Sequence, residues 1–296
     1  MTMLKSGRAR IVFSQFQYRS FTQCSARYRL SPFTRRLFNL PTPPRAPSQK
    51  HDSLNSYISY AQRTGLPENS TTYVGTHYEY TVLQTLRRFA FDLHRVGGRD
   101  DAGTDLVGTW HLPERDQALR VIVQCKALKT KLGPNLVREL DGAFRHSPVG
   151  WRTSDKLGIL ISPREATKGV RDAISKSSYP LLWMMIERDG VLRQALWNGK
   201  AEDIGLTALG VETQYGGHSS QPALKEIIFT WDGEPLPDMD KVEGEMSKLE
   251  AQWLAAWECQ DMSESGKVEL LEKVQAMFPD ATDGMPLIVQ GRGIER

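Results

Sequence analysis

The spacing of apolar residues between positions 72 and 95 has the period of an α-helix. The apolar positions in this stretch are Val82, Leu83, Leu86, Phe89, Ala90 and Leu93. We expect one helix over the whole stretch, ended by Gly97 and Gly98. Glu79 precedes Leu83 by four residues and Leu86 by seven, so its carboxylate lies on the apolar stripe. This carboxylate is therefore expected to point inward, towards the core or a site.

Two stretches after this helix have the alternation of β-strands, residues 104–110 and 119–127, joined by a polar hairpin loop. Side chains on a strand point alternately to opposite faces. On the second strand Val121, Val123 and Cys125 share one face, and Arg120, Ile122, Gln124 and Lys126 share the other. Gln124 and Lys126 are thus expected to project together from a largely buried strand.

The rest of the chain predicts alternating helices and strands as far as residue 200. The expected elements are a helix opened by Pro134, strands over 157–162, 179–187 and 191–198, and a helix over 164–177. Beyond 200 the signal is weaker, with a strand over 224–231 and one or two acidic amphipathic helices over 239–278. This order predicts an α/β fold, a sandwich around a mixed central β-sheet.

Charge is distributed unevenly along the 296 residues. Residues 1–51 carry ten Lys or Arg and no Asp or Glu, although the whole chain has a net charge of only +3. An Arg-rich and Ser-rich start without acids is typical of a mitochondrial transit peptide. The alternative is a basic arm that binds nucleic acid directly. The Pro-rich stretch over 40–50 is interpreted as a linker, with processing before or within it.

Charge along the remaining chain favours a local phosphate-binding surface. Residues 110–176 have a net charge of +6, and residues 201–296 have a net charge of −12. A basic region within an otherwise acidic protein is typical of phosphate binding. No apolar run approaches the ~20 residues of a membrane-spanning helix, so an integral membrane protein is not expected. The three cysteines have no zinc-site spacing, and three cannot all pair internally, which favours a reducing compartment.

Four polar residues are expected to converge near the end of the second strand of the hairpin, namely Glu79, Asp105, Gln124 and Lys126. A buried lysine requires a negative partner, which could be a simple salt bridge or a metal and phosphate site. Hydrolysis of a phosphodiester needs a hard cation held by oxygen ligands and positive charge for the transition state. Asp105, the Gln124 side chain and the backbone carbonyl of Cys125 could hold Mg²⁺, and Lys126 could contact the water or the phosphate.

These residues and their order resemble the PD-(D/E)xK nuclease superfamily. The resemblance is carried by Glu79, by "DDAGTDLVG" with Asp105, and by "QCK" with Gln124 and Lys126. It is strongest to the Mrr-like branch, through QxK and the downstream "VRELDGAF" and "GILIS" stretches. With the basic start and the long tail, the chain also resembles the fungal mitochondrial "required for respiratory growth protein 7" family.

The resemblance implies a restriction-endonuclease-like three-layer core, a catalytic set of Glu79, Asp105, Gln124 and Lys126, and Mg²⁺ bound at Asp105, Gln124, Cys125 and also Glu79. We expect residues 1–50 to form the transit peptide and linker, residues 51–200 the nuclease-like domain, and residues 201–296 a partly helical acidic extension.

The expected location is the mitochondrial matrix, and the expected partner is nucleic acid, mitochondrial DNA before RNA. Arg99, Lys129 and Lys131 are candidate phosphate contacts. Gln124 replaces the usual acid of the superfamily, which leaves open a second hypothesis: a noncatalytic factor that binds nucleic acid or a protein.

Overall fold

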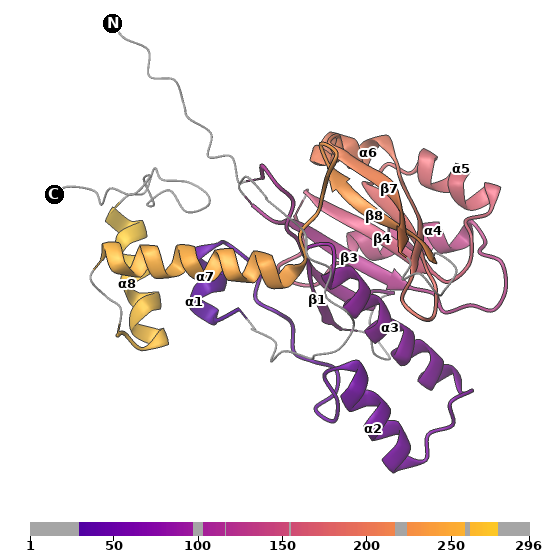
Figure 1. Cartoon of the computed structure of the whole chain (residues 1–296), viewed down its shortest axis with the longest axis horizontal. Helices are drawn as coiled ribbons and strands as arrows, with labels where there is room; N and C mark the ends of the chain where they lie inside the picture. The colour runs from indigo at the N-terminus through magenta and orange to yellow at the C-terminus, as the bar shows by residue number, and fades with distance from the viewer. Residues whose placement is uncertain are drawn as a thin grey trace, which may run out of the picture.

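The computed structural model describes residues 30–96, 103–115, 117–153, 155–216, 224–257 and 261–277, with backbone alone at 215, 216, 224, 225 and 277. Figure 1 shows a central sheet flanked by helices, with a pair of C-terminal helices to one side. In the part of the chain described here, no helix is long and apolar enough to span a membrane.

Six strands form the central sheet in the order β1-β2-β3-β4-β5-β6. They are β1 Phe91–Arg95, β2 Leu106–Trp110, β3 Leu119–Cys125, β4 Lys156–Ser162, β5 Leu181–Ile186 and β6 Leu192–Trp197. The pairs β3-β4 and β4-β5 are parallel, and the other three pairs are antiparallel. The expected α/β class with a mixed central sheet is therefore confirmed.

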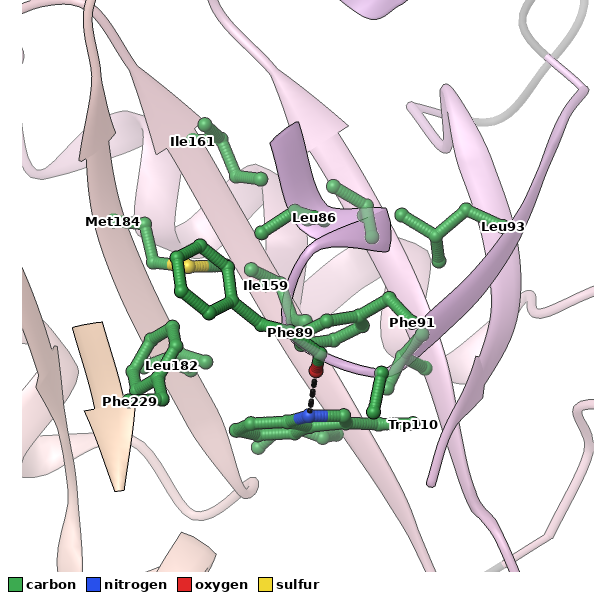
Figure 2. Packing of buried hydrophobic residues seen from close by; sticks show 14 of the residues in the cluster. Leu86, Phe89, Phe91, Leu93, Trp110, Ile159, Ile161, Leu182, Met184 and Phe229 are labelled. Carbon is green, nitrogen blue, oxygen red and sulfur yellow. Dashed lines mark hydrogen bonds between the residues drawn. The ribbon is translucent and has the colours of Figure 1, made fainter. Parts of the chain in front are cut away.

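One face of the sheet packs against α3 (Thr71–Arg87) and a second, three-stranded sheet. Figure 2 shows this core, in which Phe89, Trp110 and Phe229 meet over the strands. The indole Nε1 of Trp110 donates a hydrogen bond to the Phe89 carbonyl at 2.9 Å, so the polar atom of this buried side chain has a partner.

The opposite face is covered by α4 (Asn135–Arg145) and α5 (Lys168–Lys176). Gly158 on β4 permits a close approach of α4, because a Cβ at this position would lie 3.3 Å from the Phe144 ring and 3.5 Å from Leu140. Alternation along β3 and β4 thus gives each face its own apolar layer, and the sheet lies between two layers.

The second sheet and the remaining helices complete the chain. They are α2 Leu54–Thr64, α6 Gly199–Ala201, a π-helical turn Glu202–Leu206, β7 Leu209–Gly216, β8 Leu224–Trp231, β9 Glu234–Pro235, α7 Met239–Ala256 and α8 Glu264–Met277. Leu209, Phe229 and Leu236 share the core of the central sheet, so the folded unit continues past residue 200. The one or two acidic helices expected over 239–278 are present as two, α7 and α8.

The prediction of a single helix over residues 72–95 was wrong at the C-terminal end of that stretch. The helix ends at Arg87, Ala90 adopts a positive φ of 64°, and the chain continues as β1. The apolar residues of β1 alternate over too short a run to be distinguished from a helix by spacing. Pairing with β2 decides the outcome, since it satisfies the backbone groups of β1.

The N-terminal residues described here form part of the fold, although residues 1–50 were expected to be leader and linker. Helix α1 (Pro32–Leu37) packs Phe33 and Leu37 against Trp253, Leu254 and other apolar residues of α7 and α8. Arg35, which is largely buried, donates to the Asp92 carboxylate on β1 at 2.9 Å. Helix α1 therefore connects the C-terminal helices to the edge of the central sheet.

Candidate active site

Asp105 and Cys125 meet where the β2-β3 ladder ends. The N–H of Asp105 donates to the Val123 carbonyl at 2.9 Å, which extends the ladder one residue beyond Leu106. The carboxylate Oδ2 of Asp105 accepts the N–H of Cys125 at 2.7 Å. The Asp105 side chain thereby substitutes for the next backbone acceptor, and this bond holds a carboxylate directly at the end of β3.

Gln124, the residue before Cys125, is buried, with 2% of its surface exposed. Within the described ranges its Oε1 has no hydrogen-bond partner. Gly103 lies close to it with φ of +82°, and a Cβ there would lie 3.2 Å from Gln124 Nε2. An unsatisfied buried amide oxygen costs roughly 1–3 kcal/mol, so a ligand that used this oxygen would recover that energy.

Lys126 points towards α4. Its Nζ lies 2.9 Å from a carboxylate oxygen of Glu139, and its N–H donates to the Ile161 carbonyl at 2.8 Å. The side chain is 26% exposed. The partner of this lysine is thus Glu139 and not Asp105. Sequence reasoning did not single out Glu139, although it lies within the "VRELDGAF" stretch.

Glu79 points inward, as its position on the apolar stripe predicts, and forms an ion pair with Nε of Arg95 at the end of β1. Both side chains are largely buried, and Arg95 also donates to the Thr76 hydroxyl at 3.4 Å. Helix α3 covers the face of the sheet opposite α4. Glu79 and Lys126 therefore approach the end of β3 from opposite layers.

The thiol of Cys125 lies among these charged groups and packs against the apolar layer that includes α3. Burial raises the pKa of the Cys125 thiol well above its usual value, and the carboxylates of Asp105 and Glu79 raise it further. Arg95 and Lys126 oppose this rise in the pKa without reversing it. The thiol is therefore protonated at neutral pH and unsuited to nucleophilic attack, and the metal-binding role expected for the backbone carbonyl stays a prediction.

Two of the three expected phosphate contacts lie among the described residues. Lys129 and Lys131 are exposed in the segment that follows β3. Arg99 lies outside the described residues. In the described ranges, no three His, Cys, Asp or Glu side chains gather as a metal site. Of the two carboxylates expected as metal ligands, Glu79 is paired with Arg95, and Asp105 stands at the end of β3.

Comparison with known proteins finds a family whose model matches part of this chain. The family model described as "Required for respiratory growth protein 7" matches residues 70–118 and 114–215. An uncharacterized mitochondrial protein of Schizosaccharomyces pombe is 34% identical, over 52% of this chain and 62% of that protein. This chain therefore spans less than two thirds of that relative.

Two further comparisons are more distant. The mitochondrial required for respiratory growth protein 7 of Saccharomyces cerevisiae is 26% identical, over 44% of this chain and 71% of that protein. Among solved structures, the MspJI restriction endonuclease in complex with a 27-mer oligonucleotide matches 47% of this chain and 30% of that chain, with 11% identity. Its TM-score is 0.27, which is too low to support a statement about this protein. The family match extends from α3 into β7 and agrees with the names of the relatives. The chain belongs to the required for respiratory growth protein 7 family.

Proposed function

We propose that this protein is a mitochondrial nuclease of the matrix that uses Mg²⁺ to hydrolyse phosphodiester bonds, with DNA as the preferred substrate. The observation that carries the proposal is the buried Gln124 oxygen, which has no partner among the described residues. Gln124 stands between Val123 and Cys125, which both hydrogen-bond to Asp105. The names of the relatives support the coarser part, a mitochondrial protein required for respiratory growth.

The donor set at the end of β3 fits a hard cation. Carboxylate, amide and backbone carbonyl oxygens are ligands that Mg²⁺ accepts, and Asp105, Gln124 and Cys125 offer one of each. Bound Mg²⁺ would supply a water of lowered pKa and positive charge for the phosphoryl oxygens. Glu79 was also expected to contribute, but it is already paired with Arg95, so we leave it out of the proposed metal site.

Lys126 is the proposed electrophilic group. Glu139 holds its ammonium at 2.9 Å, and backbone bonding to Ile161 fixes the residue at the end of the strand. A positioned ammonium stabilises the negative charge that develops on phosphate oxygens in the transition state. Because Glu139 is 46% exposed, the pair is accessible enough for the ammonium to exchange Glu139 for a phosphate.

One observation favours a second function, a noncatalytic factor that binds nucleic acid. The proposed metal site holds one carboxylate, Asp105, because Glu79 is paired with Arg95, and the Oδ2 of Asp105 already accepts the Cys125 N–H. A site with one carboxylate binds Mg²⁺ less tightly than one with two, because a unit charge pair at 4 Å contributes up to roughly 4 kcal/mol at an effective dielectric of 20.

The deciding experiment measures cleavage by purified protein that begins at residue 31 and thus retains α1. Duplex DNA, single-stranded DNA and RNA are incubated with Mg²⁺ or with EDTA. We expect Asp105→Asn and Lys126→Ala to abolish Mg²⁺-dependent cleavage of DNA while nucleic-acid binding persists. Asp172→Asn and Lys176→Ala are matched controls, since both residues are exposed on α5.

The same variants separate the two functions in cells. Under the nuclease proposal, neither Asp105→Asn nor Lys126→Ala restores respiratory growth to a strain that lacks the protein, whereas both control variants do. If purified protein cleaves no substrate and both site variants restore growth, the noncatalytic function replaces the nuclease. A fluorescent fusion tests the matrix location, with residues 1–50 as the expected leader.

A further inference from the structure

An open groove lies beside the candidate site, at the edge of the sheet where three neighbouring strands end. It has a volume of about 390 Å³ and is lined by Lys129, Pro163, Arg164, Glu187 and Arg188. These residues come from the segments that follow β3, β4 and β5. Because these three strands are parallel, their carboxyl ends lie at one edge, and the three segments meet there.

The groove is positively charged. Lys129, Arg164 and Arg188 are exposed, and none has an ion-pair partner within 4.0 Å among the described residues. The one carboxylate in the lining belongs to Glu187 and is already engaged by Arg193 at 2.8 Å. Among the described residues, these three cations thus face an open volume without an ion-pair partner.

Hydrogen bonds to backbone carbonyl groups connect this groove to the candidate site. The guanidinium of Arg188 donates to the Ala127 carbonyl at 3.3 Å, and Ala127 directly follows Lys126. Lys126 in turn donates its N–H to Ile161, two residues before Pro163. A chain of phosphates lying in the groove would therefore pass close to the end of β3, where the Lys126 backbone lies.

We propose that this groove binds the sugar-phosphate backbone of a nucleic-acid strand and leads it to the end of β3. This inference rests on the proposed nuclease function, because it places the groove beside the proposed catalytic site. It extends that function by assigning Arg164 and Arg188 as binding residues. Guanidinium groups donate two parallel hydrogen bonds to phosphate oxygens, which suits them to this ligand. The cations come from three separate segments and are exposed, an arrangement that matches successive phosphates better than one enclosed anion.

The test measures DNA binding without cleavage. Full-length Asp105→Asn protein in EDTA is titrated into a fluorescein-labelled duplex, and the anisotropy is followed over a series of NaCl concentrations. We expect Arg164→Glu with Arg188→Glu to weaken binding about tenfold, and to make the slope of log K against log salt shallower by about two, since each lost phosphate contact removes ~0.9. The control, Arg63→Glu with Lys176→Glu, makes the same charge change on α2 and α5, away from this edge.

Further variants and competitors make each outcome decisive. If the glutamate variant does not fold, Arg164→Gln with Arg188→Gln takes its place, because it introduces no new charge. This variant should shift the slope in the same direction by a smaller amount. The proposal is overturned if both groove variants bind with the affinity and slope of the control. It is also overturned if a mononucleotide competes as well as the oligonucleotide does, because the groove would then hold a single phosphate. A groove effect in a protein that never cleaves DNA supports the groove and removes the catalytic proposal.

Discussion

The packing of α1 into the C-terminal helices predicts that residues 31–50 are required for a stable fold. Phe33 is fully buried, with its ring centroid 5.5 Å from that of Trp253. Replacing a buried phenylalanine by alanine costs about 3–5 kcal/mol, because transfer energy is lost and a cavity remains. We expect Phe33→Ala to lower the free energy of unfolding of the unit formed by α1, α7 and α8 by about this amount.

Deleting residues up to 50 should have a larger effect than this substitution. It removes Leu37 as well, and it leaves Asp92 largely buried without the guanidinium of Arg35. Breaking a buried ion pair by removing one partner costs about 3–5 kcal/mol, which lowers the stability of β1 in addition to that of the helices.

Hydrogen exchange and urea unfolding measure both effects. Protein that begins at residue 31 should protect the amides of α7 and α8, and protein that begins at residue 51 should not. Val149→Ala is the control, since Val149 is 81% exposed and its truncation should change stability by less than about 0.5 kcal/mol. The reasoning fails if the chains beginning at 31 and at 51 unfold at the same urea concentration and show equal protection in α7 and α8.

Three further predictions concern the site and the core. Gln124→Glu should destabilise the metal-free protein, because it adds a second carboxylate near Asp105. The same change should tighten the binding of Mn²⁺ or Mg²⁺. Calorimetry that shows no gain in metal affinity would contradict the proposed metal site. Arg95→Ala should cost about 3 kcal/mol in urea unfolding, because Glu79 is left largely buried without its guanidinium partner, whereas Glu79→Leu with Arg95→Leu should cost clearly less. Burial lowers the pKa of His111 from 6.5 to about 4, which the charge of Asp92 opposes and that of Arg35 reinforces. Protonation of His111 therefore favours the unfolded state, and up to about 3 kcal/mol of stability should be lost as the pH falls from 6.5 to about 4. His111→Gln should remove this loss. An unchanged pH profile of stability in that variant would refute the assignment to His111.

The position of the candidate site could be predicted from local sequence because it lies on regular strands. Alternation along β3 places Gln124 and Lys126 on one face and Cys125 on the other, and the structure has this arrangement. The site assignment as a whole stays a prediction. Local pattern could not identify the partners of these residues, since Glu139 and Arg95 are brought in by tertiary packing from α4 and from the end of β1.

Other elements could not be predicted because their own pattern was too weak or had another interpretation. Strand β7 carries the polar run "VETQYG", and it becomes a strand by pairing with β8 along its whole length. The basic stretch around α1 has the composition of a leader, yet Phe33 and Leu37 are buried by helices more than 200 residues away in the sequence.

The sequence by itself determined the α/β class, the hairpin of β2 and β3, and the faces of β3, because these depend on apolar periodicity over a few consecutive residues. Tertiary structure alone decided that the helix ends at Arg87, that Lys126 pairs with Glu139, and that Arg164 and Arg188 meet Lys129 in one groove. The physical reason is the range of the interactions: periodicity is set by neighbouring side chains, whereas ion pairs and grooves form between segments that only the folded sheet brings together.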